Sequence, residues 1–321
     1  MHRRLDRRAN RRIFANATIR KGIAMSPDRP VPVLPETRRF SLPDGEMSAL
    51  VWPRPGATRI VFLHGNGFNA GVYRQMLGLL AAQYEIVAPD LRGHGATTLP
   101  ADPARHRDWH VYAHDIIAML DQLDSRPFVL AGHSMGGVTA LLTAEKLTGK
   151  PLGLALIDPV ILPRSFYAIN HTPLWHVMWR RFPLVQGALR RGNFWPNTQA
   201  AKARYASRPP FVHWADGVLD DYLTSGLRLV EGGVALSCDP AWEAANYASH
   251  RHDPVRAARH AGVPVQVLKA GKASTVMDEK GLIRAGTAIT PLPSHSHLAP
   301  MENPAACAAW IAQIVEGFAS F

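Results

Sequence analysis

The stretch FVLAGHSMGG, residues 128–137, joins an apolar run to a serine, Ser134, that is enclosed by Gly132 and Gly136. The apolar run is typical of a strand that is buried on both faces. The pattern G-x-S-x-G predicts a sharp turn from this strand into a helix, with the serine at the tip. Small neighbours are required because strand and helix approach closely there. A pattern of five residues is short, however, and its interpretation depends on the rest of the chain.

The segments around this turn alternate between apolar runs and segments with helical spacing. Such alternation predicts a mostly parallel sheet, joined by right-handed crossovers and covered by helices on both faces. Ahead of it, residues 38–52 have the pattern of an antiparallel edge hairpin. The predicted strands cover 59–65, 84–95 with the turn that follows, 128–134, 152–159 and 263–271, and the predicted helices cover 71–83, 108–123, 137–147 and 305–318.

The character of the chain changes between about residues 163 and 240. This segment is rich in Trp and Arg and lacks the strand–helix alternation, which favours an inserted helical cap. We therefore predict an α/β core formed by residues 26–162 and 241–321, with the cap at 163–240. Residues 1–25 contain eight Arg or Lys and one Asp but no apolar stretch of the kind that a secretory signal requires. This basic arm is predicted to be disordered.

Composition restricts the classes of function. The arm supplies +7 of the formal net charge of +11, so the body is only mildly basic and no specific nucleic-acid partner is expected. No apolar run approaches the ~20 residues of a membrane-spanning helix, and none is predicted. Cys238 and Cys307 are far apart and form neither a disulfide framework nor a metal-ligand pattern, which favours a reducing cytoplasm. The oligomeric state is not predicted.

Clusters of chemically distinctive residues follow the predicted strands, at the edge of the sheet where open α/β folds bind ligands. They read HGNG, DLRGHG, GHSMGG, LIDP and KAGKAST. Together with FLHGNGFNAGVY at 62–73 and HSHLAPMENP at 295–304, the chain resembles the α/β-hydrolase fold family over roughly residues 38–318. The resemblance implies a serine hydrolase with Ser134 as nucleophile. Serine at this position argues against the relatives that attack with a carboxylate.

A serine nucleophile needs a histidine to accept its proton. His297 lies between the last predicted strand and the final helix, and Glu302 and Pro304 follow it as in the family pattern H-x4-E-x-P. His295 is the alternative, whereas His133 is predicted to be a packing residue. The resemblance further implies an oxyanion hole formed by two backbone N–H groups, those of Asn66 and Met135.

The third member of the triad, a carboxylate, departs from the commonest family pattern. That pattern has an aspartate three residues after Gly271, and this chain has Ser274 there. A minority of relatives take the acid from the end of the preceding strand, where this chain offers Asp158. Asp278 and Asp253 are the alternatives. We predict Asp158 as the acid that orients His297.

These residues predict a cofactor-free and metal-free hydrolase of carboxylic esters, with thioesters, lactones or C–C bonds of diketones as variants. The cap contributes a dense set of aromatic rings, which favours an apolar or aromatic small-molecule ester as substrate, although the same rings are also what a small cap core requires. The alternative hypothesis is a catalytically idle α/β-hydrolase that acts as a small-molecule binding or signalling module. The aromatic residues are Phe166, Trp175, Trp179, Phe182, Phe194, Trp195, Phe211, Trp214 and Tyr222.

Overall fold

The computed structural model describes residues 34–172, 175 and 178–319. The chain divides into two units, Met1–Pro32 and Val33–Phe321, and the description below concerns the second. The predicted basic arm at 1–25 lies outside the described residues.

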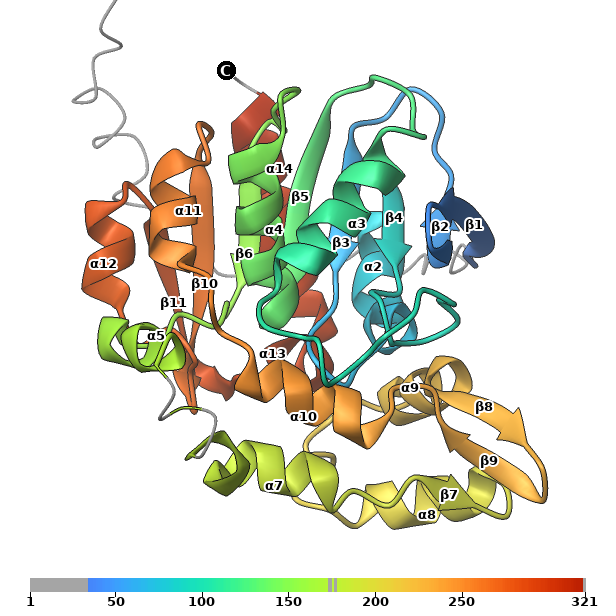
Figure 1. Ribbon diagram of the computed structural model, residues 1–321. Helices are drawn as coiled ribbons and strands as arrows, with labels where there is room; N and C mark the ends of the chain where they lie inside the picture. The colour runs from blue at the N-terminus through green and yellow to red at the C-terminus, as the bar shows by residue number, and fades with distance from the viewer. Residues whose placement is uncertain (1–33, 173–174, 176–177, 320–321) are drawn as a thin grey trace, which may run out of the picture. The chain divides into compact units, whose positions relative to one another are not determined.

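An eight-stranded sheet with the order β1-β2-β4-β3-β5-β6-β10-β11 forms the centre of the described chain (Figure 1). The β1–β2 and β2–β4 pairs are antiparallel, and every pair from β4 to β11 is parallel, as the alternating pattern predicts. The strands are β1 (Glu36–Leu42), β2 (Gly45–Trp52), β3 (Arg59–Leu63), β4 (Glu85–Pro89), β5 (Phe128–His133), β6 (Leu154–Ile157), β10 (Val265–Lys272) and β11 (Ala288–Ser296).

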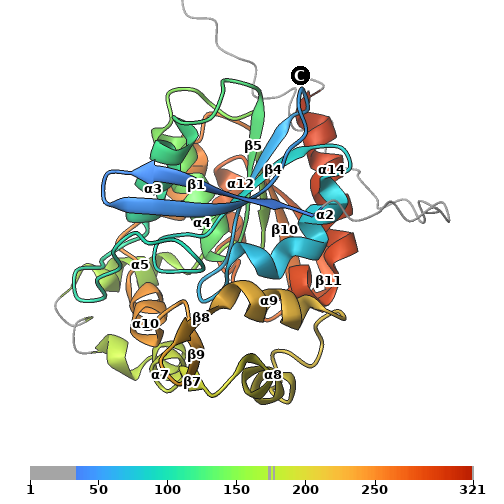
Figure 2. The same ribbon diagram turned by 90° about the vertical axis from the view of Figure 1, so that its right-hand side faces the viewer.

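Helices cover both faces of this sheet. In Figure 2, α2 and α14 lie on one side and α3 and α4 on the other, and each layer closes its own hydrophobic core against the strands. Strands β3 to β6 are almost completely buried, which explains their continuous apolar runs. The helices of the core are η1 (Ala70–Tyr73), α2 (Arg74–Leu80), α3 (His110–Leu120), α4 (Met135–Lys146), α11 (Pro254–His260), α12 (Glu279–Arg284), α13 (Ala299–Glu302) and α14 (Pro304–Ala319).

Strand β11 is absent from the sequence-based prediction. It contains Pro291 and Pro293, and proline cannot donate a hydrogen bond to a neighbouring strand. The strand order explains how it is tolerated, because β11 is an edge strand that pairs with β10 alone. Most of its residues are exposed or half-buried, so no apolar run marks it in the sequence.

The segment predicted as a helical cap contains helices and, in addition, a small antiparallel sheet with the order β7-β9-β8. The prediction of helices alone is therefore incomplete. These strands have two to four residues each, too few for an alternating pattern to be recognised. The elements are α5 (Arg164–Asn170), η2 (Trp179–Arg181), α7 (Pro183–Leu189), β7 (Phe194–Trp195), α8 (Thr198–Ala206), α9 (Val218–Gly226), β8 (Leu227–Val230), β9 (Gly233–Leu236) and α10 (Pro240–Ala248).

The aromatic rings of this segment pack largely against one another, in two groups. One group lies near α5 and α7, and the other joins α8 and α9 to the loop after β3 through Phe68. The first group contains Phe166, Trp175 and Phe182, and the second contains Tyr205, Phe211, Trp214 and Tyr222. The rings of the second group belong to the same hydrophobic cluster as residues of α2 and α14, so this group is continuous with the core on that face of the large sheet.

Candidate active site

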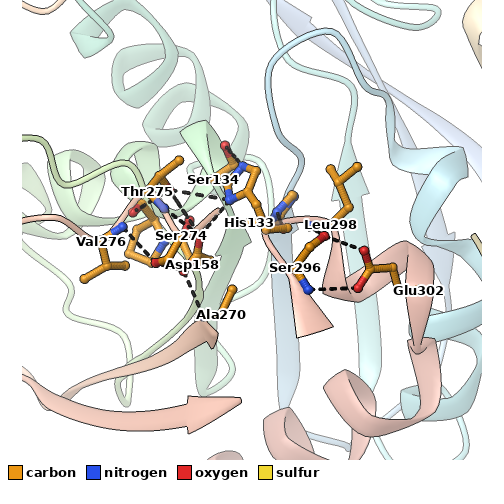
Figure 3. A network of polar contacts seen from close by, with 12 residues as sticks. His133, Ser134, Asp158, Ala270, Ser274, Thr275, Val276, Ser296, Leu298 and Glu302 are labelled. Atoms are coloured by element: carbon orange, nitrogen blue, oxygen red, sulfur yellow. Dashed lines mark hydrogen bonds and ion pairs between the residues drawn. The ribbon is translucent and has the colours of Figure 1, made fainter. Parts of the chain in front are cut away.

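Ser134 and Asp158 lie near each other at the carboxyl edge of the sheet, where β5 and β6 end, beside Ser274 and Thr275 of the loop after β10 (Figure 3). Ser134 follows β5 and begins the turn into α4. Its backbone has φ 57° and ψ −118°, a conformation that non-glycine residues rarely adopt. The serine side chain is thus held at the tip of a strained turn.

The two glycines around Ser134 are explained by close backbone contacts. A Cβ on Gly136 would lie 2.0 Å from the carbonyl oxygen of Leu63, and one on Gly132 would lie 2.6 Å from the backbone of Gly136. No side chain fits at these distances. The G-x-S-x-G pattern therefore reflects the approach of α4 to β3 and β5.

Ser134, His297 and Asp158 form one hydrogen-bonded chain. Nε2 of His297 lies 3.0 Å from Oγ of Ser134, and Nδ1 of the same ring lies 2.7 Å from Oδ2 of Asp158. Because a carboxylate accepts only, Nδ1 carries the proton, which leaves Nε2 free to accept one from the serine. The Asp158 side chain is only 1% exposed, whereas that of His297 is 21% exposed.

Asp158 is held by the loop that follows β10. Its Oδ1 accepts hydrogen bonds from the backbone of Ala270 (2.9 Å) and from Oγ of Ser274 (2.6 Å), and its Oδ2 accepts one from the backbone of Thr275 (2.9 Å). Burial disfavours the charged carboxylate, but the bonds from His297, Ser274 and Thr275 outweigh it and lower the pKa of Asp158. Ser274, at the position of the usual family aspartate, thus donates a hydrogen bond to Asp158.

The alternative acids and the alternative base have other partners. Asp278 accepts a hydrogen bond from the backbone of Gly281 at the start of α12, and Asp253 caps α11. His295 contacts Asn303, with 3.2 Å between Nε2 and Nδ2. None of the three is bonded to Ser134 or His297 within the described residues.

Further hydrogen bonds fix the turn that carries His297. Its backbone N–H donates to the carbonyl of Lys272. The carboxylate of Glu302 accepts from both the backbone and the hydroxyl of Ser296, and that hydroxyl accepts from the backbone of Leu298 (Figure 3). Glu302, noted in the sequence for its spacing from His297, therefore closes this turn.

The predicted oxyanion residues flank Ser134. Met135 follows it directly, and a Cβ on Gly65 would lie 3.3 Å from Cβ of Ser134, so the loop that carries Asn66 lies against the elbow. Among the described residues, neither backbone N–H of this pair has a hydrogen-bond partner. Both are therefore available to an oxygen atom of a bound substrate.

The Asn66 side chain also has a definite place, although the predicted oxyanion hole uses only the backbone N–H of this residue. Its Nδ2 donates to the carbonyl of Glu243 (3.0 Å), and its Oδ1 accepts from Asn246 (2.9 Å), both on α10. The next residue, Gly67, donates from its backbone to His94 and accepts from the hydroxyl of Tyr222. The loop is thus anchored to α9 and α10 as well as to the core.

A mostly parallel sheet with helices on both faces, a strained serine turn after its fifth strand and a histidine near its last strand defines the α/β-hydrolase class. The model of the alpha/beta hydrolase family matches residues 60–310, and the chain belongs to this family.

The chain is 25% identical to the 2-(acetamidomethylene)succinate hydrolase of Mesorhizobium japonicum over 250 residues, which are 78% of this chain and 83% of the relative. It is 32% identical to the human monoglyceride lipase over 118 residues, or 35% of this chain and 38% of the lipase. A thioesterase domain from the curacin biosynthetic pathway has the same fold, with a TM-score of 0.68 at 19% identity, over 87% of this chain and 99% of the domain.

No helix among the described residues is both long and apolar enough to cross a bilayer. No group of three or more His, Cys, Asp or Glu side chains in the same part of the chain is arranged to hold a metal ion.

Proposed function

We propose that the protein is a serine hydrolase that cleaves carboxylic esters through an acyl-enzyme intermediate. The observation that carries the proposal is the hydrogen-bonded chain from Asp158 through His297 to Ser134. Such a chain meets the geometric requirement for a nucleophile, its base and the group that orients the base.

In the first half-reaction, Oγ of Ser134 attacks the ester carbonyl carbon while Nε2 of His297 accepts the hydroxyl proton. Asp158 stabilises the resulting imidazolium and stays ionised, in keeping with its lowered pKa. The negative charge on the carbonyl oxygen is stabilised by the backbone N–H groups of Asn66 and Met135. The tetrahedral intermediate then collapses, His297 protonates the leaving alcohol, and the acyl group remains on Ser134.

In the second half-reaction, water attacks the acyl carbon, and His297 accepts one of its protons. The second tetrahedral intermediate then collapses: its bond to Ser134 Oγ breaks, His297 returns the proton to that oxygen, and the carboxylic acid is released. The cycle consumes one water molecule and needs no cofactor.

We propose an ester with an apolar or aromatic group as substrate. Phe68 supports this, because a Cβ on Gly65 would touch both its ring and Ser134, and the ring continues into those of Trp214 and Tyr222. An apolar acyl or aryl group beside Ser134 would contact the half-buried ring of Phe68, which the two buried rings behind it hold in place. The thioesterase domain of similar fold keeps thioesters within the proposal. We also propose a cytoplasmic location, which fits the two buried free cysteines.

The alternative proposal, an idle hydrolase that binds a small molecule, predicts a site that does not react. The two proposals are separated by a fluorophosphonate probe, which phosphonylates activated serines, and by p-nitrophenyl esters of increasing acyl length. We expect labelling at Ser134 and ester turnover, both abolished in Ser134→Ala. Ser125→Ala, a change at an exposed loop serine, is the matched control and should behave as the wild type. Labelling elsewhere, or an active Ser134→Ala variant, refutes the proposal.

A further inference from the structure

His133, which the sequence analysis assigns to packing, makes two hydrogen bonds in a fully buried position. Its Nδ1 lies 2.8 Å from Oη of Tyr73, and its Nε2 lies 2.8 Å from the backbone carbonyl oxygen of His297. Both rings, those of Tyr73 and His133, are 0% exposed. The ring of His133 also packs on that of His297, with 4.8 Å between their centroids.

The direction of these bonds follows from the chemistry of the partners. A carbonyl oxygen only accepts, so Nε2 of His133 carries the proton and donates to His297. Burial lowers the pKa of His133 to about 3, so the ring is neutral and its Nδ1 is an acceptor. The hydroxyl of Tyr73 must then donate to Nδ1, because it is the only proton donor between the two atoms.

The same hydroxyl has a second role. Its oxygen accepts a hydrogen bond from the backbone N–H of Gly65 at 3.0 Å. Gly65 immediately precedes Asn66, the proposed oxyanion donor. One continuous chain of donors and acceptors therefore runs from Gly65 through Tyr73 and His133 to the backbone of His297.

We propose that Tyr73 and His133 are positioning residues. Through this buried chain of hydrogen bonds, called the relay below, they hold the loop of Asn66 and the turn of His297 in place relative to Ser134. The inference rests on the proposed function, since it assigns to both residues the placement of groups that act in that reaction. Neither residue touches the substrate. Misplacement of a reacting group by ~1 Å is enough to slow an enzyme about 100-fold.

The first test removes one oxygen atom. Tyr73→Phe keeps the buried ring, which packs on Phe62, but deprives Gly65 of its acceptor and His133 of its donor. We expect kcat to fall about 10-fold to 100-fold with KM changed less than about threefold, because transition-state placement is lost and substrate contacts are not. Tyr84→Phe is the matched control, since its hydroxyl contacts the carbonyl of Ala312 instead, and it should keep full kcat.

The second test separates positioning from packing at His133. His133→Leu removes both bonds and should lower kcat about 100-fold. The amide nitrogen of His133→Gln reaches the place of Nε2 and can donate to the His297 carbonyl. The kcat of this variant should therefore be at least tenfold higher than that of His133→Leu. Equal losses in the two variants would show that only the ring's packing matters and would overturn the proposal.

A double-mutant cycle tests whether the two residues act through one chain. Tyr73→Phe combined with His133→Leu should lose clearly less than the product of the two single effects, because the second change breaks a connection that is already broken. If the loss of kcat in the double variant equals the product of the two single losses, or if Tyr73→Phe keeps an unchanged kcat, the relay is contradicted.

A measurement without substrate keeps this inference separate from the proposed function. Nitrogen-15 spectra of the wild type should show His133 as the neutral Nε2–H tautomer at pH 7, and the Nδ1–H tautomer or a charged ring would overturn the relay. If the wild type turns over no ester and takes up no probe, the proposed function fails, and these spectra still decide the hydrogen-bond chain.

Discussion

The candidate site has a nucleophile half, residues 64–67 and 132–136, and an acid half, Asp158 with the loop 270–275. The nucleophile half depends on backbone geometry: a strained serine, glycines that no side chain can replace and free backbone N–H groups. The acid half depends on side chains, since Asp158 is held by Ser274 and Thr275. Backbone geometry restricts the sequence to one pattern, whereas a carboxylate can be supplied from any neighbouring strand end.

The largest expected effect on kcat comes from a substitution in the acid half. Asp158→Asn should lower kcat about 10⁴-fold, as in other triads, because the amide no longer fixes the imidazole tautomer or stabilises the imidazolium. Asp278→Asn is the matched control and should stay near wild-type turnover. A fall in the Asp278 variant with an unaffected Asp158 variant would move the acid to the loop after β10.

Acid should destabilise the nucleophile half before the acid half. Burial lowers the pKa of His94 to about 4 and that of His133 to about 3. Such neutral histidines contribute fully above their unfolded pKa of about 6.5 and lose this contribution as the pH falls toward the folded value, roughly 3 kcal/mol for His94. Asp158 has a lowered pKa, so its contribution is present above about 3.9 and is lost only below that value.

The measurement is urea unfolding from pH 7.5 to 4, with hydrogen exchange of peptides from the two halves. We expect the free energy of unfolding to decrease from about pH 6.5 downward and peptides of residues 64–67 to exchange before those of residues 270–275. Asp90 opposes part of this loss, because burial raises its pKa to about 6 and its protonation favours the fold as the pH drops. A constant free energy of unfolding down to pH 4 would contradict the assignment of buried neutral histidines.

A single methyl group tests the backbone constraint. In Gly136→Ala the new Cβ would meet the carbonyl oxygens of Leu63 and His64 at 2.0 and 2.6 Å, so α4 or β3 must shift. We expect a loss of about 3 kcal/mol in the free energy of unfolding, at the upper end for overpacking. Gly78→Ala, which would meet nothing within 4 Å, is the control and should be neutral or slightly stabilising. Equal stability of both variants would show that the elbow is not tightly packed.

The smallest effect is expected for the hydroxyl of Ser274. Ser274→Ala removes one of the bonds to Asp158, but those from Ala270 and Thr275 remain. Turnover should fall about tenfold, since a hydrogen bond to a charged group contributes roughly 1.5 kcal/mol at the lower end of its range. A loss as large as that of Asp158→Asn would mean that Ser274 has a direct part in the reaction.

The sequence predicted those parts of the fold that carry a periodic or steric signal. The alternation gave the parallel strands because burial on both faces demands apolar runs, and the glycines around Ser134 are demanded by contact. Strand β11 was missed because an edge strand may carry prolines, and β7 to β9 because they are very short. The family membership and the fold class are confirmed.

The roles of Ser134, His297, Asp158, Asn66 and Met135 stay predictions, although the structure brings these residues together. The sequence alone does not predict the hydrogen bonds that hold these residues in place. The bonds of Tyr73 with His133 and of Ser274 with Asp158 join residues that are distant in the chain, and their geometry depends on rotamers and loop paths. No local pattern encodes such a pair.

The backbone of Ser134 bears on how the chain has been selected. Among the described residues, those other than glycine with positive φ are Ser134, Asp158 and Ala273, and all three belong to the site or its supporting loop. Each such conformation costs of order 1–3 kcal/mol, which glycine would largely relieve. A chain under selection for stability alone would drift toward glycine at residue 134, whose hydroxyl is bonded only to His297 among the described residues. Serine at this costly position is what selection for the proposed reaction would maintain.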